Sequence, residues 1–191
     1  NEAPEPLYIT ASGGTESTSG DFKIHTITGP GTFSVSSAGN STGSNTVDYL
    51  VVAGGGGTPG NGYNNTPNGG AGAGGLRASA TTYSIGCNPA KPLVCGVSAL
   101  PVCVQGYPIT VGGGGAGGSS GAGNAGANGA NSTFSSITST GGGVGAMSPG
   151  GDPAGNGGSG GGGMGPGKGG GSGKTAPVSP PKGHPGGVGV S

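Results

Sequence analysis

The side chains best suited to covalent chemistry are three cysteines, Cys87, Cys95 and Cys103, which stand eight residues apart. A tetrahedral zinc site is not predicted, because no histidine lies near them and no pair has the C-x-x-C spacing. A disulfide is expected of such cysteines in an extracellular chain, and free buried thiols are the alternative. We favour Cys87 with Cys103, a bond that would stabilise the fold by roughly 3 kcal/mol through loop closure. The odd number leaves one thiol, which is either buried or bridges two subunits.

One tyrosine is a candidate for carbohydrate binding. Tyr63 lies in the polar segment 62–68, between two glycine-rich runs. An exposed aromatic ring at this place could stack on a sugar. The alternative is a loop that is anchored by a single aromatic side chain.

Phosphate-binding and catalytic motifs are incomplete. The run Gly-Ser-Gly-Lys-Thr at 171–175 ends like a phosphate-binding loop, but Lys168 replaces the first glycine and no apolar strand precedes it. Six acidic residues and two histidines form no visible group of nucleophile, base and orienting residue. His25 lies in a strand pattern, where structural hydrogen bonding is expected. We therefore predict no enzyme, no cofactor and no metal site.

Charge and hydropathy argue against two further classes of partner. The formal net charge is +0, and charged residues make up only 6% of the chain. Such a chain lacks the positive surface that attracts nucleic acid. It also lacks a run of about 18 apolar residues, so we predict no membrane insertion.

The elements that must position these residues are predicted to be β-strands. Residues 1–6 read as an extended arm, and residues 7–53 as a small antiparallel β-sandwich or sheet. Its strands are expected at Leu7–Thr10, Asp21–Thr28, Thr32–Ser36 and Val47–Val52. The last of these is the most apolar run in the chain and is typical of a strand buried on both faces.

Glycine dominates the rest of the chain. Of 54 glycines, nearly all lie after residue 50, between short β-prone segments at Leu76–Ile85, Val102–Val111 and Ser132–Thr140. A helix is excluded, because glycine costs about 1 kcal/mol against alanine in a helix interior. Collagen would need glycine at every third position, and the chain keeps that period only briefly. The pattern instead predicts polyproline-II-like tracts that pack closely without side chains, so that Gly113 and Gly142 should not tolerate valine.

The order of these segments resembles the glycine-rich domain that is common in tailed-phage structural proteins. The likeness covers roughly residues 8–175, and it runs through 21–26, 31–35, 47–57, 72–77, 107–118 and 131–143. It implies that the tracts form a polyglycine II sandwich and that loops between them contact a host. The segment Cys87–Cys103 departs from this pattern as an insertion. The family has no shared catalytic residues to carry over.

The resemblance implies an extracellular structural role. We expect residues 54–175 to form the glycine-rich domain and residues 176–191 to form an extended arm rich in Pro and Gly. The first functional hypothesis is a subunit of a phage tail fibre or virion-surface fibre that presents host-binding loops to a glycan or protein. The second is a secreted or cell-surface microbial filament. In either case the main partner is the chain itself, as a trimer or a helical polymer.

Overall fold

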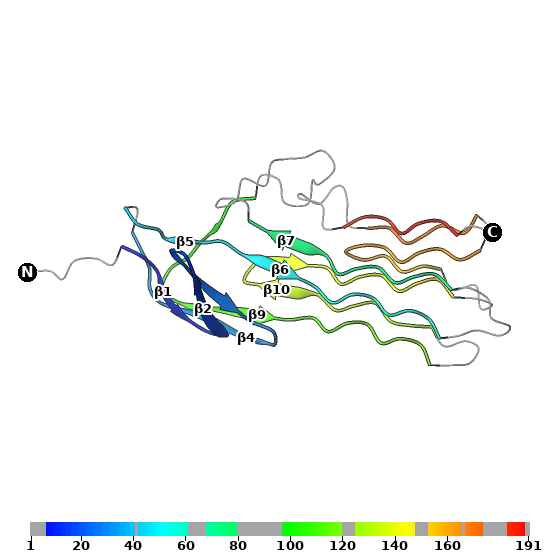
Figure 1. Ribbon diagram of the computed structural model, residues 1–191, viewed down its shortest axis with the longest axis horizontal. Helices are drawn as coiled ribbons and strands as arrows, with labels where there is room; N and C mark the ends of the chain where they lie inside the picture. The colour runs from blue at the N-terminus through cyan, green and yellow to red at the C-terminus, as the bar shows by residue number, and fades with distance from the viewer. Residues whose placement is uncertain are drawn as a thin grey trace, which may run out of the picture.

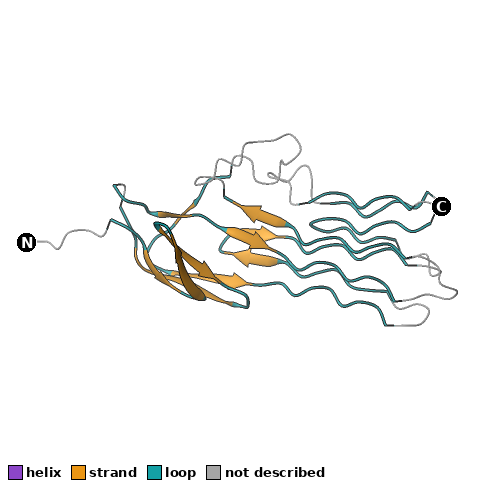
Figure 2. Cartoon of the chain, viewed as in Figure 1, coloured by secondary structure: helices purple, strands orange, loops and turns teal. Residues whose placement is uncertain are grey.

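The chain is elongated, with its β-strands gathered toward one end and long extended tracts running to the other (Figure 1). The computed structural model describes residues 7–40, 42–60, 68–79, 97–119, 125–147, 153–165, 167–173 and 183–189. Strands and irregular backbone account for these residues, and none of them is helical (Figure 2). The predicted all-β fold is therefore confirmed.

The strands are short. They form one five-stranded sheet and three separate two-stranded sheets, and all of the pairings between them are antiparallel. The larger sheet has five strands in the order β1-β4-β9-β10-β11, and the pairs are β2-β3, β5-β8 and β6-β7. The strands are β1 (Thr10–Ser12), β2 (Thr15–Ser19), β3 (Phe22–Thr26), β4 (Gly31–Ser37), β5 (Thr46–Val47), β6 (Leu50–Val52), β7 (Leu76–Ala78), β8 (Leu100–Pro101), β9 (Gly106–Thr110), β10 (Ser132–Phe134) and β11 (Ile137–Ser139).

The five-stranded sheet joins parts of the chain that are far apart in sequence. Strand β4 pairs with β9, which places Phe33 opposite Tyr107. Strand β9 in turn pairs with β10 on its other side. The sheet therefore extends across the boundary that the sequence suggests at residue 53. Its first two strands alone would leave one side of β4 without a hydrogen-bonded neighbour, and β9 satisfies that side.

Three of the expected β segments differ in detail from the structure. The first, Leu7–Thr10, overlaps β1 by one residue, because the strand begins at Thr10 and continues to Ser12. The run Val47–Val52 divides into β5 and β6, and it is not buried on both faces, because Leu50 and Val52 are 67% and 53% exposed while Val51 is buried. The run Ser132–Thr140 is a hairpin of β10 and β11 that turns at Ser135, which has a positive φ of 55°. Strand β2 was not predicted, because its sequence Thr-Glu-Ser-Thr-Ser is polar and fully exposed.

A compact hydrophobic core lies among the strands. Phe134 is 8% exposed, and its ring lies 6.0 Å from Phe33, 6.3 Å from Tyr107 and 6.4 Å from Tyr49, measured between centroids. The other buried members are Val35, Val51, Val102 and Ile137. This core fixes the ends of the strands from which the glycine tracts continue.

Candidate functional site

The residues with ordinary catalytic or metal-binding chemistry are not gathered into a site. Within the described ranges, no group of three or more His, Cys, Asp or Glu residues could hold a metal ion. Nor does the described part of the chain include a helix that is long and apolar enough to cross a membrane.

The sequence-predicted site residues fall mostly outside the described residues. Cys87, Cys95 and Tyr63 all do so. Cys103 is exposed, and its sulfur lies 3.6 Å from the hydroxyl oxygen of Tyr107. The Cys103 amide donates a hydrogen bond to the same hydroxyl at 2.8 Å, so Tyr107 ties this residue to the core. The disulfide and the carbohydrate contact stay predictions.

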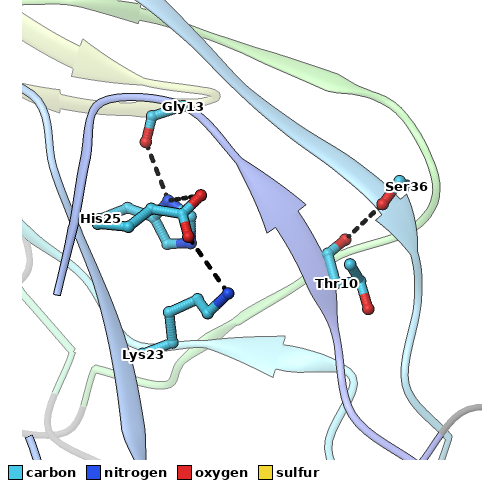
Figure 3. A network of polar contacts seen from close by, with 6 residues as sticks. Thr10, Gly13, Lys23, His25 and Ser36 are labelled. Atoms are coloured by element: carbon cyan, nitrogen blue, oxygen red, sulfur yellow. Dashed lines mark hydrogen bonds and ion pairs between the residues drawn. The ribbon is translucent and has the colours of Figure 1, made fainter. Parts of the chain in front are cut away.

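His25 has a structural environment (Figure 3). Its Nδ1 lies 2.9 Å from the carbonyl oxygen of Gly13, and its ring packs edge-on against Phe33 with centroids 5.1 Å apart. Lys23 and Glu16 form an ion pair of 3.2 Å across the same β2–β3 hairpin. These contacts hold a polar, exposed hairpin against the sheet.

The most unusual arrangement in the molecule is what we call the glycine bundle. It consists of the tracts 53–60, 68–75, 111–119, 125–131, 140–147, 153–158, 159–165, 167–173 and 183–189. Several tracts continue directly from strands: 53–60 follows β6, 111–119 follows β9 and 140–147 follows β11, while 68–75 and 125–131 lead back into β7 and β10 (Figure 1). The strands therefore set the spacing and direction of the tracts.

Backbone hydrogen bonds between neighbouring tracts hold the bundle together. In tract 68–75 the amides of Gly69, Gly72 and Gly75 donate to tract 140–147, with N···O distances of 2.8, 2.7 and 2.7 Å. Donors that point to one neighbour are thus three residues apart, which is the repeat of a polyproline II helix. Successive residues face different neighbours, so one tract can bond to several others.

Tract 140–147 is the centre of the bundle. Its residues donate to or accept from tracts 53–60, 68–75, 125–131, 153–158 and 159–165. Gly141, Gly142 and Gly143 are all buried. Because the tract is surrounded on all these sides, its neighbours have little freedom to move apart.

The bundle needs glycine at its inner positions because backbones touch there. A Cβ added at Gly142 would overlap the Gly72 carbonyl oxygen and would lie 2.7 Å from the Gly56 amide nitrogen. Real Cβ atoms essentially never come closer than 3.0 Å, and backbone cannot swing aside as a flexible side chain can. Similar overlaps with carbonyl oxygens occur at Gly54, Gly57, Gly69, Gly72, Gly115, Gly129, Gly145, Gly161 and Gly186.

Not every glycine in the bundle has this role. A Cβ at Gly113 would meet no atom within 4 Å. Within the single chain, close backbone contact accounts for the glycine at position 142 but not for the glycine at position 113, and the effect of either valine variant on assembly stays a prediction. Sequence alone does not separate the two, since both lie within runs of glycine.

The tract ends define a second region of interest. Tracts 53–60, 111–119 and 140–147 lead away from the sheets and end at what we call the far end of the bundle, where 68–75 and 125–131 begin (Figure 1). The segments between these tracts in the sequence, including the one that carries Tyr63, lie outside the described residues. The bundle thus places the ends of several described tracts at one end of an elongated body.

Comparison with known proteins supports one assignment. A family model described as a glycine-rich domain matches residues 26–191. Comparisons with curated proteins and with solved structures found no match. The matched range starts at the last residue of β3 and includes every tract of the glycine bundle. The chain therefore belongs to the glycine-rich domain family.

Proposed function

We propose that this chain is a non-catalytic structural subunit of an extracellular fibre, at a phage tail or virion surface. The glycine bundle is the observation that carries the proposal. It forms a long body from backbone hydrogen bonds, without a large hydrophobic core, and it is anchored to a small core of aromatic and aliphatic side chains. Such a body can act as a spacer that holds its far end away from its base.

The far end is the part that we propose to be adhesive. Loops carried on a rigid scaffold commonly perform binding, and tracts 53–60 and 68–75 have ends there. Tyr63 lies between these two tracts in the sequence. In this proposal its ring contacts a glycan or protein of the host surface.

A secreted or cell-surface microbial filament is the second candidate. Some amides of tract 111–119 have no partner among the described residues, and they favour it because edges of this kind can pair with further copies of a chain. The chain would then build a homopolymer instead of capping a fibre as a closed trimer.

Electron microscopy of the native assembly tests the proposal and separates the two candidates. A phage or virion fibre predicts closed oligomers of fixed size, attached to particles packed with DNA. A filament predicts open helical polymers of variable length without particles. If the native chain occurs in neither form, as a dispersed monomer bound to no larger structure, the proposed structural function is wrong.

A further inference from the structure

One side of the glycine bundle is open. Among the described residues, tract 111–119 exchanges backbone hydrogen bonds with tracts 53–60 and 125–131, as from Gly115 to the Gly55 carbonyl at 2.8 Å. Its Gly112 amide also donates to the hydroxyl of Ser132 in β10 at 2.9 Å. Four of its other amides have no partner among the described residues. They belong to Gly113, Gly114, Ala116 and Gly117, and all four residues are exposed. At a repeat of three residues these form two short rows of free donors, Gly113 with Ala116 and Gly114 with Gly117, comparable to the unpaired groups of an edge strand.

The same side of the tract has space that the single chain leaves unused. A Cβ at Gly113 would meet nothing within 4 Å, and the nearest atoms at Gly114 and Gly117 would be backbone oxygens at 3.7 Å, an ordinary contact distance. The neighbouring tract 125–131 is different, since its exposed positions carry Ala127, Asn128 and Ala130. Close packing within one chain thus explains why the inner tracts need glycine. It does not explain why Gly113, Gly114 and Gly117 on this open side are glycine.

The opposite side of the bundle carries side chains that hinder pairing, although Gly169 and Gly187 there are also exposed. Its last tracts, 167–173 and 183–189, carry Lys168, Pro185 and Val188 at exposed positions. Charged side chains and proline are the usual means of blocking edge pairing, because proline has no amide hydrogen and a charge resists burial. Tract 111–119 contains neither. Of the described tracts on these two sides, 111–119 is thus the one that carries neither a charge nor a proline.

We propose that tract 111–119 pairs with the same tract of a second copy of this chain, antiparallel, about a two-fold axis. A backbone without side chains at the contact can pack closest against these amides, and the second copy supplies such a backbone. The antiparallel geometry already exists within the chain, where Ala127 and Ala130 donate to Ala116 and Gly113 at 2.9 and 3.0 Å. The contact continues the bundle from one subunit into the next, and the formal net charge of +0 offers no overall repulsion.

This pairing adds to the proposed structural function one specific contact between subunits. It rests on that function only in assuming that the chain works as part of a fibre. Its test is a double variant, Gly113→Val with Gly117→Val, studied by sedimentation equilibrium over a concentration series. The matched control is Gly70→Val with Gly187→Val, because a Cβ at either of these exposed tract glycines also meets nothing within 4 Å. We expect the wild type and the control to dimerise alike, and the double variant to dissociate at least tenfold more readily. Its melting temperature should match that of the wild type at concentrations low enough for both to be monomeric, because dimerisation itself stabilises the fold.

Two results would overturn the pairing: a wild-type chain that stays monomeric throughout the series, or a double variant that associates as the wild type does. If the double variant does not fold, amide exchange in the wild type decides. Exchange at Gly113, Gly114 and Gly117 must then slow as the concentration rises, and exchange independent of concentration contradicts the pairing. Fibres seen by microscopy without this contact would leave the structural function intact, so the two proposals fail separately.

Discussion

The variant Gly142→Ala is expected to lower the free energy of unfolding by at least about 3 kcal/mol, because one methyl group must separate several backbones. The Gly142 amide donates to the Gly54 carbonyl at 2.8 Å, and the Gly142 carbonyl accepts from Gly129 at 2.9 Å. The added carbon would also lie 2.8 Å from the carbonyl carbon of Ala73. Relief of these overlaps breaks hydrogen bonds on more than one side of the central tract. Chemical denaturation of the purified chain measures the loss.

The matched control is Gly70→Ala. Gly70 lies in an adjacent tract, is exposed, and has nothing within 4 Å of an added Cβ. Alanine reduces the conformational entropy of the unfolded chain, so this variant should be neutral or more stable by up to about 1 kcal/mol. Equal losses in the two variants would show that general flexibility, and not close backbone contact, determines the response to substitution.

The variant Phe134→Ala is expected to cost about 3–5 kcal/mol, the usual range for removal of a buried phenylalanine ring. This ring contacts three other aromatic rings and lies in β10, between β9 and β11. Its loss leaves a cavity where the strands that extend into the tracts meet. Both the near-ultraviolet circular dichroism of the aromatic core and the denaturation midpoint should fall.

Phe22→Ala provides the comparison for this second prediction. Phe22 is 52% exposed in the β2–β3 hairpin and is not part of the core cluster. Its replacement should change the stability by less than about 0.5 kcal/mol, as surface substitutions usually do. If both phenylalanine variants were nearly neutral, the small core would not be what anchors the bundle.

Local patterns in the sequence are sufficient for much of the fold. Alternation of apolar and polar residues locates β4, where Phe33 and Val35 point into the core. The runs of glycine locate the tracts, because no other residue lets backbones approach so closely. The family likeness follows from the succession of these segments along the chain.

Long-range contacts account for what the sequence could not predict. Nothing near Phe33 indicates that β4 pairs with β9, which lies far along the chain. The polar hairpin of β2 and β3 depends on His25 reaching Gly13 and Phe33. Gly113 and Gly142 look alike in sequence, yet only the arrangement of neighbouring tracts makes one of them irreplaceable.

Amide hydrogen exchange along tract 68–75 tests the central claim most directly, namely that backbone hydrogen bonds order the glycine. We predict slow exchange at Gly69, Gly72 and Gly75, which donate to tract 140–147. Exchange should be fast at the exposed Gly70 and Ala73, whose amides have no partner among the described residues. Protection at every third residue, independent of protein concentration, is the expected result. Uniformly fast exchange along the tract would contradict it, because the bundle would then lack the hydrogen bonds that define it.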